Sequence, residues 1–145
     1  MTREYTPRET RWVTEYVLAH WASAELAGYV SYQVPLGPLA QGATQRAAPR
    51  ADCIIYLAHK VVIIEADTEN ITSALGQLLY YDYLFPLTPG NVDRNKPRDL
   101  TLLLLDMPDT YFRAFSTKYN IDIDTWAPPW LLEYVRERGQ KRGTI

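Results

Sequence analysis

The sequence predicts an α/β domain in which a mixed central sheet is flanked by helices. Two short, mostly apolar runs, residues 51–57 and 61–66, follow one another closely, as is typical of neighbouring strands buried on both faces. An amphipathic stretch separates them from a third apolar run at residues 100–105. Strands joined through a helix run parallel with a right-handed crossover, whereas closely spaced strands pair antiparallel. The sheet is therefore expected to be mixed.

A helix is predicted at the start of the chain. Thr6, Pro7 and Glu9 form a capping signature, because threonine can cap a helix, proline tolerates the first helical position and glutamate reaches back to the cap. Apolar residues then recur at helical spacing to about residue 26. Gly28 is the expected stop.

The helix is expected to lead into a strand, a loop and a strand hairpin. Residues 29–34 alternate weakly and are predicted to form the strand, and residues 35–49 contain the glycines and prolines typical of a loop. The apolar runs at 51–57 and 61–66 would then pair about a turn at residues 58–59.

The rest of the chain is expected to add one crossover and further helical segments. The expected elements are a helix from about residues 68–70 to before Pro86, a loop over 87–98, a strand over 100–105, short helices over 110–118 and 129–138, and a weaker extended segment over 121–126. One domain of residues 1–145 results, with its core at about 9–106 and a helical addition at 107–145.

The composition excludes several classes of protein. The 145 residues are 47% hydrophobic with a formal net charge of −2, whereas disordered chains combine low hydrophobicity with high net charge. A single cysteine excludes a disulfide scaffold. No run approaches the roughly 20 apolar residues of a membrane span, and the polar N-terminus lacks the apolar core of a signal peptide. We therefore expect a cytoplasmic protein with no membrane partner.

Three carboxylates are expected to gather at one end of the sheet. Asp52 begins the second strand, and Glu65 and Asp67 lie near the end of the third, where alternation would place both on one face. The hairpin centred on residues 58–59 sets Asp52 opposite Glu65. Clustered carboxylates repel one another unless a cation lies between them, and Mg²⁺ and Mn²⁺ prefer oxygen ligands. Asp52, Glu65 and Asp67 are therefore candidate metal ligands, although Asp52 alone could instead cap a turn.

The distribution of charge favours a nucleic-acid partner more than its sum does. Residues 51–93 hold six acids and one base, whereas the remainder holds fourteen bases and eleven acids. An acidic centre with basic flanks suits a metal site that acts on a phosphate backbone held by lysine and arginine.

These features resemble the PD-(D/E)XK nuclease superfamily, most closely its RecB/Cas4-like branch. The resemblance is carried by Asp52, by Val-Val-Ile-Ile-Glu-Ala-Asp at 61–67 and by Gln77 followed by Tyr81, and it covers roughly residues 9–106. It implies a restriction-endonuclease-like αβββαβ core and Mg²⁺- or Mn²⁺-dependent hydrolysis of DNA. Asp52 and Glu65 would bind the metal, and Gln77 and Tyr81 would support the site or contact DNA. The short length for that family favours a homodimer or a partner subunit.

Asp67 departs from the family pattern, which has lysine at this position. An aspartate here would add a metal ligand, orient the attacking water, or mark a domain that has lost catalysis and serves as a scaffold for nucleic acid or a protein. Lys60 is a poor substitute, since seven extended residues span about 23 Å. Gln77 and Tyr81 share one helix face, which fits a helix–sheet hydrogen bond equally well. Whether the chain is an enzyme stays open at this point.

Overall fold

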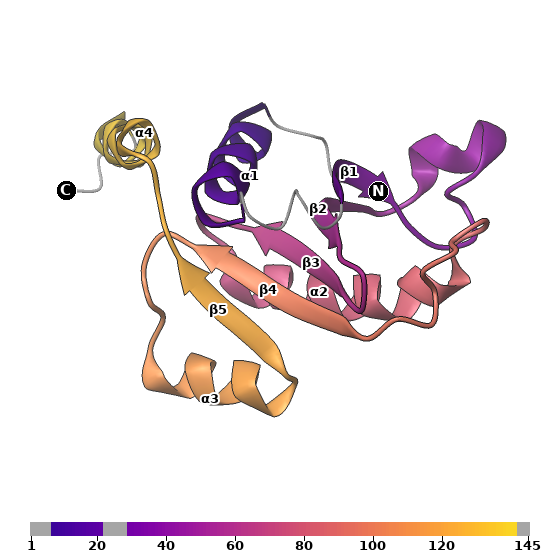
Figure 1. Cartoon of the computed structure of the whole chain (residues 1–145). Helices are drawn as coiled ribbons and strands as arrows, with labels where there is room; N and C mark the ends of the chain where they lie inside the picture. Colours follow the sequence, from indigo (N-terminus) through magenta and orange to yellow (C-terminus); the bar gives the residue numbers. More distant parts are fainter. Residues whose placement is uncertain (1–6, 22–28, 142–145) are drawn as a thin grey trace.

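The protein, seen in a computed structural model that describes residues 7–21 and 29–141, is built on a five-stranded mixed sheet (Figure 1). Its elements follow the order α1 (Pro7–His20), β1 (Tyr29–Pro35), η2 (Gly42–Ala47), β2 (Arg50–Tyr56), β3 (Val61–Ala66), α2 (Ile71–Leu84), η3 (Phe85–Leu87), β4 (Arg98–Leu104), α3 (Thr110–Lys118), β5 (Ile121–Thr125) and α4 (Pro129–Lys141).

The strands lie in sequence order across the sheet, β1-β2-β3-β4-β5. β1 pairs antiparallel with β2, and β2 with β3, whereas β3, β4 and β5 run parallel. The α2 crossover between β3 and β4 explains the change, because a parallel pair needs a connection long enough to return the chain to the same end. The expected mixed sheet is confirmed.

Helices cover both faces of the sheet. In Figure 1, α1 and α4 lie on one side and α2 and α3 on the other. Alternation along β3 divides the core accordingly: Ile63 packs into the cluster on the α2 side, and Val62 and Ile64 pack into the cluster that contains the apolar stripe of α1. Every residue of β3 is buried, so this strand is the centre of the fold.

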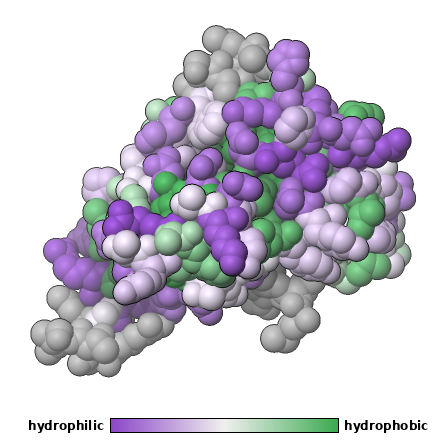
Figure 2. Space-filling view, turned by 90° about the horizontal axis from the view of Figure 1, so that it is seen from below, coloured by the Kyte–Doolittle hydropathy of each residue, from purple (hydrophilic) through white to green (hydrophobic). Residues whose placement is uncertain are grey.

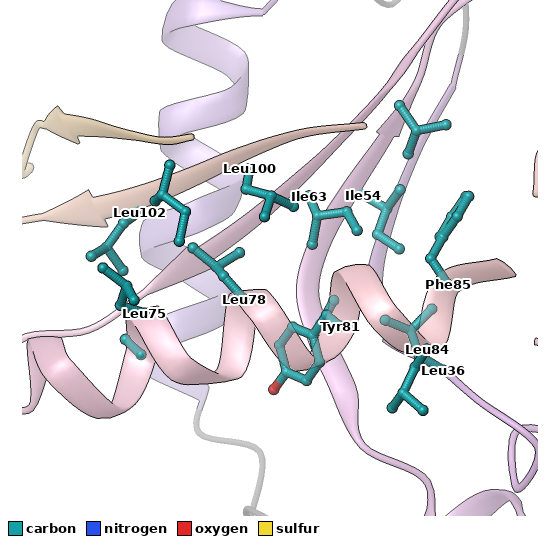
Figure 3. Packing of buried hydrophobic residues seen from close by; sticks show 14 of the residues in the cluster. Leu36, Ile54, Ile63, Leu75, Leu78, Tyr81, Leu84, Phe85, Leu100 and Leu102 are labelled. Atoms are coloured by element: carbon teal, nitrogen blue, oxygen red, sulfur yellow. The ribbon is translucent and has the colours of Figure 1, made fainter. Parts of the chain in front are cut away.

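The apolar face of α2 fixes one side of the sheet. Leu75 and Leu78 recur at helical spacing and are buried against Ile63, Leu100 and Leu102 of the strands (Figure 3). Figure 2 views the molecule from the side of α2 and α3, and its apolar side chains are interspersed with hydrophilic ones.

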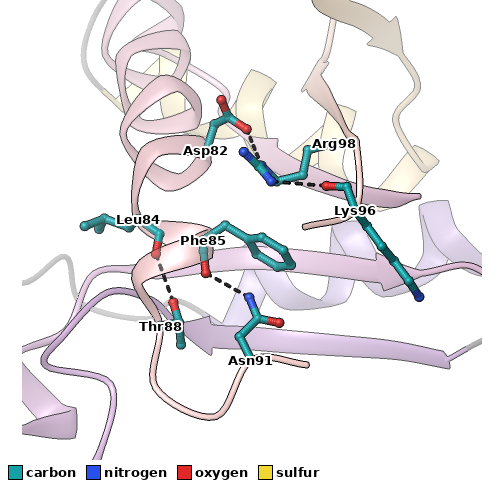
Figure 4. Close-up of polar contacts among 7 residues, drawn as sticks. All are labelled: Asp82, Leu84, Phe85, Thr88, Asn91, Lys96 and Arg98. Atoms are coloured by element: carbon teal, nitrogen blue, oxygen red, sulfur yellow. Dashed lines mark hydrogen bonds and ion pairs between the residues drawn. The ribbon is translucent and has the colours of Figure 1, made fainter. Parts of the chain in front are cut away.

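The loop that returns the chain from α2 to β4 is held by polar contacts (Figure 4). Asn91 donates from Nδ2 to the carbonyl oxygen of Phe85 at 2.8 Å, and Thr88 donates from its hydroxyl to the carbonyl oxygen of Leu84 at 3.1 Å. At the start of β4, Arg98 pairs with Asp82 of α2 at 2.5 Å. These bonds anchor β4 against the end of α2.

Three sequence expectations differ from the structure or lie outside it. The first helix ends at His20 rather than near residue 26, and the imidazole Nδ1 of His20 lies 3.0 Å from the carbonyl oxygen of Tyr16 in its last turn. The expected cap Thr6 and the expected stop Gly28 lie outside the described residues. The weaker extended segment is a full sheet strand, β5. None of the helices in the described ranges is long and apolar enough to cross a membrane.

Candidate functional site

The β2–β3 hairpin has the register expected from the sequence. Cys53 pairs with Ile64, and Ile54 pairs with Ile63. Asp52 and Glu65 are the next positions along the two strands, so they occupy facing places at the same end of the hairpin. Side chains in facing positions have Cβ atoms about 4.5–5.5 Å apart.

Asp52 is buried and clamps the end of the hairpin. Its side chain is 5% exposed. Oδ2 accepts a hydrogen bond from the backbone N–H of Ala66 at 3.0 Å, and Oδ1 accepts one from Nε2 of Gln33 at 3.2 Å. Asp52 therefore reaches across to β3, directly beside the position of Glu65. Each oxygen of a carboxylate carries two lone pairs, so these bonds leave acceptor capacity for a cation.

Gln33 was missed at the sequence level. It lies in the edge strand β1 with φ of 50°, in the left-handed region that non-glycine residues seldom adopt. The strand pairs on either side of it, Tyr32 with Cys53 and Val34 with Ala51, set Gln33 opposite Asp52. Its only sequence signal is a polar side chain in a weakly alternating strand.

Glu65 is completely buried, with 0% of its surface exposed. Alternation along β3 places it on the same face as Ile63, toward α2. Its Oε1 atom accepts no hydrogen bond within the described ranges, while the side chain as a whole does interact with its surroundings. Two carboxylates in facing buried positions repel each other, so a cation between Asp52 and Glu65 would be stabilising.

Asp67 lies one residue beyond the end of β3, so strand alternation does not by itself place it on the face that Glu65 takes. β3 ends at Ala66, so Asp67 begins the turn into α2. Its Oδ1 accepts hydrogen bonds from the backbone N–H groups of Glu69 and Asn70, both at 2.8 Å. Short polar side chains commonly stabilise turns in this way. The structure thus gives Asp67 a local structural role.

Gln77 and Tyr81 lie one turn apart on α2, as expected. Tyr81 is 4% exposed and belongs to the apolar cluster between α2 and the sheet (Figure 3). Gln77 is half-buried, and both side chains make polar or electrostatic contacts. Their placement on the face that Glu65 also takes is compatible with support of the site and with a helix–sheet bond.

A two-carboxylate site fits a hard divalent ion, whereas the expected set of three does not form. Among residues 7–21 and 29–141, no group of three or more His, Cys, Asp or Glu side chains is placed to hold a metal ion. Mg²⁺, however, usually keeps several waters and binds through one or two carboxylates plus substrate phosphates. Asp52 and Glu65 meet that requirement without Asp67.

Two other residues near the hairpin, Cys53 and Lys60, take no part in the candidate site. Burial, with a smaller effect of Asp52, raises the pKa of the Cys53 thiol well above its usual range, so Cys53 is a core residue, as the sequence indicates. Lys60 precedes β3 at the end opposite Glu65 and pairs with Asp99 at 2.8 Å.

A solved structure is similar in fold to this chain. No protein-family model and no curated protein matches the chain. The crystal structure of a repair endonuclease from Pyrococcus abyssi superposes on 88% of this chain and 49% of that chain, with a TM-score of 0.50 and 12% sequence identity. The chain therefore spans about half the length of that structure. This likeness confirms the restriction-endonuclease-like α/β fold, and it does not distinguish a RecB/Cas4-like branch.

Proposed function

We propose that this chain is a metal-dependent nuclease domain that hydrolyses DNA phosphodiester bonds. The observation that carries the proposal is the facing placement of two buried carboxylates, Asp52 and Glu65, at one end of the β2–β3 hairpin. The likeness in fold to a repair endonuclease supports DNA as the substrate. Gln77 and Tyr81 would support the site from α2.

Each residue has a distinct task in this proposal. Asp52 and Glu65 hold the ion, and the hydrogen bonds from Gln33 and Ala66 fix the orientation of the Asp52 carboxylate. A bound Mg²⁺ or Mn²⁺ supplies Lewis-acid polarisation of the phosphate and a water of lowered pKa. The apolar cluster between α2 and the sheet, on the face that Glu65 takes, would keep bulk water from the buried side of the site.

The test is cleavage of duplex and single-stranded DNA with Mn²⁺, Mg²⁺ or EDTA. We expect cutting with either ion, none with EDTA, and loss of at least about a hundredfold in Asp52→Asn and Glu65→Gln, because each substitution removes a charged metal ligand. Cutting that survives in both variants at the wild-type rate would refute the assignment.

One observation favours a second candidate, a nuclease-fold scaffold that binds nucleic acid or a protein without cutting. Asp67 occupies the position of the family lysine and uses its carboxylate in the turn before α2. If catalysis was lost with that lysine, Asp67→Lys should gain cutting that Asp67→Ala does not, since both variants lose the turn bonds equally. Cutting by the wild type would exclude the scaffold.

A further inference from the structure

A cavity of about 300 Å³ opens beside the turn that follows β3. Its walls come from three separate segments: the start of α1, the β3–α2 turn and α4. Its charged lining residues are Arg8, Glu9, Asp67, Glu69 and Arg138, and the ring of Tyr134 lies among them. Because Asp67 follows Glu65 by two residues, the cavity lies at the same end of β3 as the proposed metal site. Trp12 and Leu131 of the α1-side cluster also line it, so it opens on the face of the sheet opposite to the Glu65 side chain.

Docking of α4 on α1 creates this cavity. Trp12 donates from its indole N–H to the carbonyl oxygen of Trp126 at 2.8 Å, and Trp130 donates to Oε2 of Glu15 at 2.7 Å. Figure 1 shows α4 beside α1 on the same side of the sheet. Arg8 of α1 and Arg138 of α4, which are far apart in the sequence, therefore lie close to the same tyrosine ring.

Two guanidinium groups converge in the cavity. The guanidinium carbon of Arg8 lies 4.2 Å from the centroid of the Tyr134 ring, and that of Arg138 lies 6.0 Å from the same centroid. Stacking on an aromatic ring orients a guanidinium and leaves its edge N–H groups available to an acceptor. Planar guanidinium groups recognise phosphate through two parallel hydrogen bonds.

An internal carboxylate already holds one of these cations. Oε1 of Glu69 lies 3.1 Å from Nη1 of Arg138, with the two side chains 53% and 36% exposed. An ion pair this exposed contributes little to stability. A phosphate could therefore replace Glu69 as the partner of Arg138 at small cost to the fold.

We propose that this cavity is a phosphate subsite for the DNA backbone, in which Arg8 and Arg138 bind a backbone phosphate at the same end of the sheet as the proposed metal site and Glu69 is the counter-ion that the DNA displaces. The inference rests on the proposed function and deepens it. It places the two guanidinium groups of α1 and α4 beside the turn that carries Asp67, in a cavity that Glu9, Asp67 and Glu69 also line.

The subsite predicts effects of opposite sign at the two ends of one ion pair. Arg8→Ala and Arg138→Ala should each weaken DNA binding about tenfold, as expected for loss of a charged hydrogen bond. Each should also lower the slope of log affinity against log salt by about 0.9. Glu69→Gln should tighten binding about threefold, because it frees Arg138 from a competing charge.

The experiment is fluorescence anisotropy of a labelled 20-base-pair duplex with Ca²⁺ in place of Mg²⁺, at several salt concentrations. Arg136→Ala is the matched control: Arg136 lies on the same helix, is 70% exposed, pairs with Glu133 and does not line the cavity. We expect it to change affinity less than twofold. Thermal unfolding of each variant verifies that it is folded.

The outcomes separate the subsite from the function. Wild-type binding with equal affinities in Arg8→Ala, Arg138→Ala and Arg136→Ala would refute the subsite and leave the proposed DNA function standing. Weaker binding in both Glu69→Gln and Arg138→Ala would show that the pair is only structural, which also refutes the subsite. A wild-type chain that binds no DNA would refute the proposed function itself.

Discussion

Asp52 combines a structural task and a proposed metal-binding task, and two substitutions should separate them. Asp52→Ala leaves the N–H of Ala66, in a residue with 0% exposure, without its acceptor, and it removes the acceptor of Gln33. An orphaned buried donor costs about 1–3 kcal/mol. For a chain of this size, that corresponds to a fall in melting temperature of about 2–12 °C.

Asp52→Asn should instead leave stability within about 1 kcal/mol of the wild type. The asparagine oxygen can accept from the N–H of Ala66, and its amide can donate to the side-chain oxygen of Gln33 once the Gln33 amide turns over. The substitution removes the charge, so it should abolish metal-dependent activity in a fold that stays intact.

The assay is urea unfolding followed by circular dichroism, run without divalent ions on the wild type, Asp52→Ala, Asp52→Asn and Gln33→Ala. Gln33→Ala removes only one of the two donors and should cost about 1 kcal/mol. Equal stabilities for Asp52→Ala and the wild type would refute the clamp. Equal losses in Asp52→Asn and Asp52→Ala would show that the charge, rather than the two hydrogen bonds, stabilises the hairpin.

Three further predictions concern the scaffold around the site. Asp67→Ala should cost about 0.5–2 kcal/mol in urea unfolding, the range for loss of a helix-capping side chain, because two turn N–H groups lose their acceptor; no loss would contradict the structural role. Leu78→Ala should cost about 2–5 kcal/mol, since Leu78 is 0% exposed between α2 and the sheet; a cost below about 1 kcal/mol would show that α2 packs elsewhere. Burial, and then the charges of Tyr29 and Asp93, raises the pKa of Tyr56 from 10.0 to about 12. The contribution of Tyr56 to the free energy of unfolding is therefore complete below pH 10 and is lost as the pH rises through about 12. Tyr56→Phe should reduce the fall of the urea midpoint at alkaline pH, and an unchanged fall would contradict this assignment.

Local patterns in the sequence were sufficient for the sheet and the hairpin. Two apolar runs of similar length, separated by a short turn, fix the pairing of Cys53 with Ile64, and the amphipathic stretch before β4 fixes the parallel crossover. The residue at which α1 ends, and the pairing of β5 as a full strand of the sheet, were less predictable. β5 alternates apolar and acidic residues and is stabilised largely by its neighbour β4, a contact that no local pattern contains.

The candidate site was predictable only where it depends on register. Asp52 and Glu65 follow from the hairpin alone, whereas the role of Asp67 depends on the hydrogen bonds that it accepts in the turn after β3. The approach of Arg8 to Arg138 depends on the docking of α4 on α1 through Trp126 and Trp130. Tertiary packing of elements more than a hundred residues apart leaves no short-range signal.

The most direct test of the central claim is calorimetric titration of Mn²⁺ into the chain, alone and bound to a DNA duplex, compared with Glu65→Gln. We expect one Mn²⁺ site per chain that binds more tightly when DNA is present and is lost in the variant, whose unfolding curve remains cooperative. No Mn²⁺ binding under either condition, or an identical titration in Glu65→Gln, would contradict the assignment of Asp52 and Glu65 as the metal ligands.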